Sequence, residues 1–202
     1  MSLLQGTGPE EGRLGEVVEA SSSAFTVHCY QLNGAAPLGA LVRSVAQEPT
    51  YGVVQNVATV PLDAGRRPVA LGQEEADQEA LYRSHPQLSR LFRTEFAALI
   101  VGHRAAGRLY QYLPPRPPAI HAFVETCPKD EVRAFSERLD FLPLLLSAGT
   151  SLADEVVAAF LRQAASAHED ASLFLASAGR RLATLLARDL LRLNVLLRAI
   201  QP

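Results

Sequence analysis

The stretch LGEVVEA (residues 14–20) opens a series of short segments in which apolar and polar residues alternate and glycines recur. FTVHCYQL (25–32), LGALVRSV (38–45) and YGVVQNVATV (51–60) follow it, with turn-forming residues between them. Such alternation is typical of half-buried β-strands. A glycine near the start of a strand indicates a bulge or a barrel corner where backbones approach closely. These segments therefore predict a small closed β-barrel.

The sheet is expected to continue after an interruption. FAALIVGH (96–103) is apolar enough to be a buried strand, and RLYQYL (108–113) follows a glycine turn, so the two predict a late hairpin. The acidic, helix-forming residues near 73–93 would then be an insertion between barrel strands.

A proline-rich segment, PPRPP (114–118), can be neither a helix nor a central strand and is expected to be a rigid connector. The rest of the chain has helical patterns and helix-capping residues. The predicted fold class is α+β, a small N-terminal β-barrel followed by an α-helical C-terminal half. Its parts are a flexible leader (1–12), the barrel (13–113), the connector (114–118) and a helical region (119–202).

The end of the chain predicts one leucine-rich helix with a continuous apolar stripe, because its apolar residues recur every three or four positions. The stripe consists of Leu182, Leu186, Leu190, Leu193, Leu197 and Ile200, with Arg188 and Arg192 on another side. Two interpretations are open: the stripe packs on other helices of the same chain, or it binds a second copy or another protein.

Composition supports a globular protein, since 48% of the 202 residues are hydrophobic and 20% are charged. The formal net charge of -2 argues against a general binder of polyanions. The charge is uneven, however: acids gather in residues 73–80 and arginines in residues 171–202. Opposite charges at two places suit docking, within one chain or between chains.

The expected compartment is the cytoplasm. Cys29 and Cys127 stand alone, which favours two reduced thiols. The first residues lack the basic and apolar regions of a signal peptide, and the apolar runs are too short for a membrane span.

The order of the strand motifs resembles the HAS-barrel, a domain that precedes the motor domain in HerA-type DNA translocases and in the catalytic subunits of rotary ATP synthases. That family's pattern of G-x-V, F-x-V, L-G-x-x-V and G-x-V matches Gly15–Val17, Phe25–Val27, Leu38–Val42 and Gly52–Val54. The whole chain also resembles stand-alone bacterial HAS-barrel proteins, which share LPPRPP at residues 113–118.

The resemblance implies assembly and docking without ATP turnover, because the sequence has no G-x-x-x-x-G-K-[ST] phosphate loop. We expect a non-catalytic adaptor with no cofactor. It would associate with itself or with another protein, such as a DNA-processing or motor ATPase assembly or a nuclease assembly. The alternative is a weak nucleic-acid-binding accessory factor in DNA repair. A hydrolase site formed by residues that are distant in the sequence is the least favoured interpretation.

Local candidates are few. Arg66 and Arg67 lie in a turn and could contact an anion, or could simply be solvated. Tyr110 and Tyr112 could stack on nucleic-acid bases, or could form a packed sheet edge. The scattered histidines do not predict a metal site.

Overall fold

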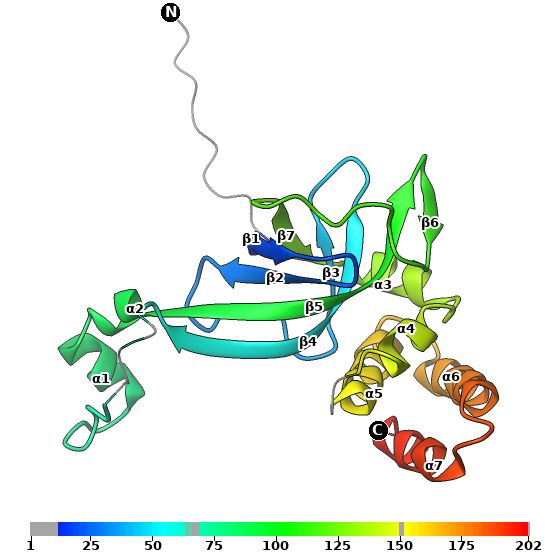
Figure 1. Cartoon of the computed structure of the whole chain (residues 1–202). Helices are drawn as coiled ribbons and strands as arrows, with labels where there is room; N and C mark the ends of the chain where they lie inside the picture. The colour runs from blue at the N-terminus through cyan, green and yellow to red at the C-terminus, as the bar shows by residue number, and fades with distance from the viewer. Residues whose placement is uncertain (1–11, 64, 66–68, 150–151, 202) are drawn as a thin grey trace, which may run out of the picture.

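The computed structural model describes residues 12–63, 65, 69–149 and 152–201, which form a β-barrel with helices packed along one side (Figure 1). The strands are β1 (Arg13–Ala20), β2 (Ala24–Cys29), β3 (Leu41–Ser44), β4 (Thr50–Pro61), β5 (Phe92–Ala105), β6 (Arg108–Tyr110) and β7 (Phe123–Thr126). The helices are α1 (Gln78–Ser84), α2 (Leu88–Leu91), α3 (Lys129–Ser136), α4 (Leu142–Leu146), α5 (Ala153–Ala165), α6 (Ala171–Leu185) and α7 (Leu190–Ala199).

The barrel is closed by antiparallel pairings. Its strands run in the order β2-β1-β7-β3-β4-β5, and β5 pairs again with β2, while β6 continues from β5 outside the ring. The register between β4 and β5 shifts at Gly52, as expected for a bulge at a barrel corner. The predicted barrel and the α+β class are confirmed.

The barrel extends beyond the expected boundary at residue 113. Strand β7 lies within the range expected to be helical and inserts between β1 and β3, so the helical region begins only after Thr126. Residues 114–118 therefore join β6 to β7 along the barrel and do not connect two halves of the molecule. A strand this short shows too little alternation to be distinguished from a helix start.

Two hydrophobic clusters explain why the strands are so apolar. Phe96, Ala98 and Ile100 on β5 point into the barrel, whereas Leu99 and Val101 on the same strand point outward and join the cluster built by the helices. Since successive side chains of a strand face opposite sides, a strand buried on both sides is a continuous apolar run. The barrel interior therefore forms one core, and the outer face of the barrel forms a second core with the helices.

The far end of the β4–β5 ribbon projects from the barrel and carries α1 and α2 (Figure 1). Asp77 caps α1 by accepting a hydrogen bond from the Ala80 amide at 2.7 Å. The insertion expected near residues 73–93 is thus found between β4 and β5, and we call this projection the arm.

A polar cluster joins α3 to the barrel. The Glu131 carboxylate accepts hydrogen bonds from the Tyr51 hydroxyl and from Arg43 Nη1, each at 2.5 Å, and Arg43 also binds Glu125. Burial, followed by the hydrogen bond to Glu131, raises the pKa of Tyr51 to about 12. Tyr51 is therefore a neutral donor at physiological pH.

No helix within the described ranges combines the length and the apolar composition that a membrane span requires.

Candidate protein-interaction surface

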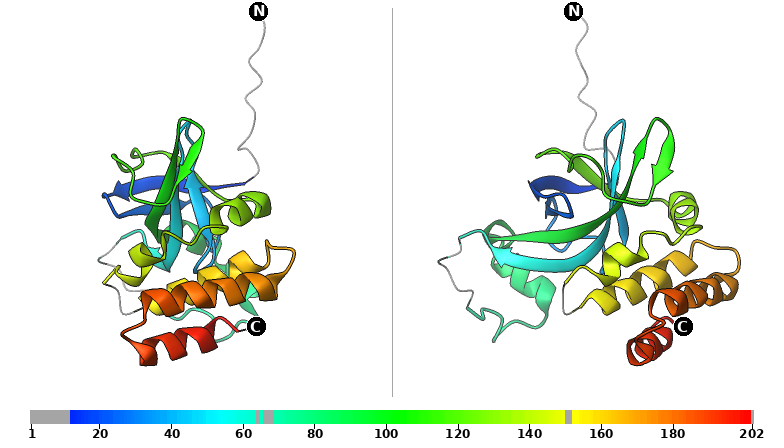
Figure 2. Two further views of the ribbon diagram at one scale, coloured as in Figure 1. Left: turned by 90° about the vertical axis from the view of Figure 1, so that its right-hand side faces the viewer. Right: turned by 45° about the vertical axis from the view of Figure 1, so that its right-hand side comes forward.

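The predicted terminal helix is in fact two helices. α6 ends near Leu186, and the Asp189 side chain accepts a hydrogen bond from the Arg192 amide at 3.1 Å, which caps the start of α7. Aspartate is a favoured N-cap because its carboxylate satisfies a free backbone amide of the first turn. The chain folds back here, so the apolar stripe predicted as continuous is divided between two packed helices (Figure 2).

Most of the stripe lies in the core of this chain. Leu182, Leu186, Leu193 and Ile200 are buried with residues of α5, and Leu197 is partly buried and packs close to Gly179. Of the two interpretations that the sequence left open, these residues therefore agree with packing on other helices of the same chain. Leu190 is the exception, since it is 64% exposed.

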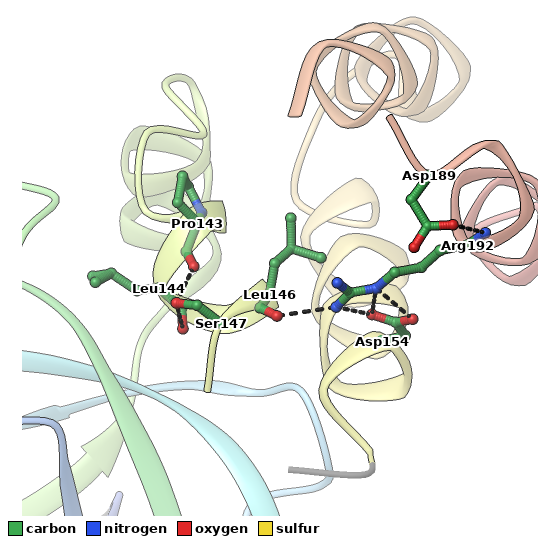
Figure 3. A network of polar contacts seen from close by, with 7 residues as sticks. All are labelled: Pro143, Leu144, Leu146, Ser147, Asp154, Asp189 and Arg192. Atoms are coloured by element: carbon green, nitrogen blue, oxygen red, sulfur yellow. Dashed lines mark hydrogen bonds and ion pairs between the residues drawn. The ribbon is translucent and has the colours of Figure 1, made fainter. Parts of the chain in front are cut away.

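Arg192 holds α7 against two other helices. Its Nη2 donates to Asp154 Oδ1 at 2.6 Å and to the Leu146 carbonyl at 3.0 Å, and its Nε donates to the same carboxylate (Figure 3). Two-point arginine–carboxylate pairs fix orientation as well as distance. Arg192, expected on an interaction surface, is therefore an internal anchor.

The opposite side of α7 carries apolar side chains that contact no core. Leu191 is 82% exposed and Val195 59% exposed, and with Leu190 they flank the exposed residues Asn194 and Arg198. We call these residues the α7 outer face. Because the inner face is also apolar, α7 has hydrophobic residues on both sides, which is typical of a helix covered on both sides.

Arginines border this face. Arg188 and Arg198 are exposed, as is Arg180 on α6, and none of the three forms an ion pair with a residue in the described ranges. Arg181, by contrast, pairs with Asp140 at 3.0 Å. Of the two arginines predicted for interaction, Arg188 is therefore available and Arg192 is not.

The stripe predicted from the sequence includes neither Leu191 nor Val195, although both side chains are exposed on α7. The signal was present in the capping residue, because a helix that begins after Asp189 puts Leu191, Val195 and Arg198 on one side. Arg66 and Arg67, the predicted anion contact, lie outside the described residues.

Other clusters of reactive side chains have structural explanations. The Ser136 hydroxyl is 2.8 Å from His168 Nε2, but Ser136 is buried and donates to the Val132 carbonyl at 2.7 Å, so it is not poised as a nucleophile. Burial raises the pKa of the Cys29 thiol to about 11, which leaves it unreactive. No group of metal-ligating side chains is found among the residues that the structure describes.

The tyrosines of the predicted stacking platform pack on each other. The rings of Tyr110 and Tyr112 lie 5.3 Å apart, and each is also 5.3 Å from the ring of His103. The pair is tilted by 50°, so the two rings do not offer parallel faces to successive bases. This arrangement corresponds to the packed sheet edge that the sequence also allowed.

Comparison with protein-family models and with curated proteins found no match for this chain. The resemblance to the HAS-barrel therefore stays a prediction from the strand motifs, and the functional argument depends on the surface of α7.

Proposed function

We propose that this chain is a non-catalytic assembly protein that associates with itself through the α7 outer face. The observation that carries the proposal is the exposure of Leu190, Leu191 and Val195 on a helix whose other side is already packed. Burying a leucine or valine completely is worth about 1.5–3 kcal/mol, so covering these side chains favours association. The barrel, which we propose to be of HAS type, would be the scaffold that presents this helix.

The wider setting is part of the same proposal. If the barrel is of HAS type, an assembly of this chain would dock in the cytoplasm on another protein, such as a DNA-processing or motor ATPase assembly or a nuclease assembly. The α7 outer face would then serve the chain's own association, and other surfaces would meet that partner.

A second candidate is the nucleic-acid-binding accessory factor in DNA repair, which the exposed arginines Arg180, Arg188 and Arg198 favour. The apolar side chains among them favour a protein partner instead, because phosphate backbones offer no apolar surface. DNA binding that weakens steeply with salt and is lost in Arg188→Glu/Arg198→Glu, while self-association is absent, would support this candidate over the first.

The test of self-association is light scattering and sedimentation over a concentration series. Leu191→Asp/Val195→Asp should lower the mass to that of a monomer and weaken association at least about tenfold, while the circular dichroism spectrum and melting temperature stay those of the wild type. Leu173→Asp/Ile120→Asp is the matched control, since both side chains are exposed elsewhere. A monomeric wild type, or a double variant that associates like the control, would overturn the proposal.

A further inference from the structure

The arm ends in an acidic surface, whereas the α7 outer face is bordered by arginines. Glu74 and Glu79 are exposed and form no ion pair within the described ranges. The same segment exposes apolar side chains, with Val69 at 78% and Leu71 at 45% exposure. We call residues 69–79 the arm tip. It combines free acids with exposed apolar residues, as the α7 outer face combines free arginines with exposed apolar residues.

These two surfaces cannot meet within one copy. The arm carries α1 away from the barrel on one side, and α6 and α7 form the outermost helical layer on the opposite side (Figures 1 and 2). In the sheet, residues 59–61 and 92–94 at the base of the arm pair with each other, whereas the pairing of β5 with β2 ends at Glu95. A contact between the surfaces is therefore a contact between copies.

The charges also disfavour a symmetric contact of α7 with itself. Such a contact would bring Arg188 and Arg198 of both copies into one interface. No residue of α7 is acidic, and the carboxylate of its N-cap, Asp189, is already engaged by the Arg192 amide. Like charges brought together in an interface oppose binding, whereas opposite charges direct it. An acidic and apolar occupant fits this face, and the arm tip of a second copy has both properties.

We propose that the copies associate head to tail, with the arm tip of one copy bound to the α7 outer face of the next. Glu74 and Glu79 pair with Arg188 and Arg198, and Val69 and Leu71 cover Leu191 and Val195. A pair joined in this way keeps a free α7 outer face on one copy and a free arm tip on the other. The contact is therefore heterologous, and it repeats to give a ring or a filament. This inference rests on the self-association proposed above and assigns its geometry.

Complementary variants test the geometry. Glu74→Arg/Glu79→Arg reverses the charge of the arm tip and leaves the α7 outer face intact. Leu191→Asp/Val195→Asp disrupts the α7 outer face and leaves the arm tip intact. Each variant alone should be monomeric in sedimentation, with association weakened at least about tenfold. An equimolar mixture of the two should form a one-to-one heterodimer that grows no further, because only one intact contact remains.

Charge exchange provides a second readout. Arg188→Glu/Arg198→Glu should weaken association, and combining it in one chain with Glu74→Arg/Glu79→Arg should restore it. Glu19→Arg/Glu137→Arg is the control, because both glutamates are exposed and belong to neither of the two surfaces. Wild-type association should also weaken as salt is raised.

The outcomes separate this inference from the function on which it rests. If Leu191→Asp/Val195→Asp is monomeric but the arm variant associates normally and the mixture forms no heterodimer, the contact is α7 with α7, and the head-to-tail geometry is overturned while self-association stands. If the wild type is monomeric, both proposals fail.

Discussion

Arg192 on α7 and Asp154 on α5 form a two-point ion pair in which Nη2 lies 2.6 Å and Nε 2.9 Å from the same carboxylate oxygen. The guanidinium also reaches the Leu146 carbonyl at the end of α4. This geometry fixes the rotation of α7 about its own axis. It therefore determines that Leu193 and Leu196 face the core while Leu191 and Val195 face outward.

Replacing Arg192 with alanine should lower the free energy of unfolding by about 1 kcal/mol, a value kept small because both side chains are about one-third exposed to water. Urea denaturation of Arg192→Ala, Asp154→Asn and the double variant gives the coupling energy. Arg180→Ala, an exposed arginine without an ion pair in the described ranges, should change stability by less than about 0.5 kcal/mol. Strictly additive effects at positions 192 and 154 would contradict the anchor.

Gly39 should tolerate no side chain. Its backbone has φ of +81°, and a Cβ would lie 2.5 Å from the Phe160 amide nitrogen of α5. Gly39→Ala should destabilise the protein by about 2 kcal/mol or more, because it combines backbone strain with a clash between the barrel and the helices.

Gly107 is the matched control for this substitution. It has a similar φ of +77°, but a Cβ there would meet nothing within 4 Å, so Gly107→Ala should cost only the conformational strain of about 1–2 kcal/mol. Thermal unfolding of the two variants compares them directly. Equal losses of stability would show that the contact between Gly39 and α5 is unimportant.

Stability should depend on the protonation of His168. Burial, and then the charge of Arg133, lowers the pKa of this imidazole below 6.5 in the folded state, where it stacks on Phe174. The unfolded chain therefore binds the proton more readily than the folded protein. This contribution to stability is complete above pH 6.5 and is lost as the pH falls through the folded pKa. His168→Gln should reduce the loss of stability between neutral and mildly acidic pH, and an unchanged slope would contradict the assignment.

The barrel was predictable because alternation and glycine positions are local properties of strands. β7 was not, since its four residues pair with β1 and β3, which come from distant parts of the sequence. For α7, Asp189 already indicated the helix start, but the rule that apolar residues are buried could not decide which leucines face the core. Which leucines face the core depends on the ion pair between Arg192 of α7 and Asp154 of α5, two helices that are separate in the sequence.

The interaction residues show the same limit. Arg188 and Arg192 look equivalent in the sequence, and only the packing of α4 and α5 makes one an anchor and leaves the other exposed. Val195 was overlooked because it lies between Leu193 and Leu197, two residues of the predicted stripe.

The late position of β7 also affects how the protein is made. A ribosome releases β1 through β6 well before Thr126, and until then β1 and β3 are nascent strands with unpaired edges. The barrel closes only when the strand that follows the proline segment has emerged, and α3 begins three residues after that strand. The barrel therefore becomes complete only as the helical region starts to emerge, and a chain that stalls before β7 is an open sheet prone to aggregation.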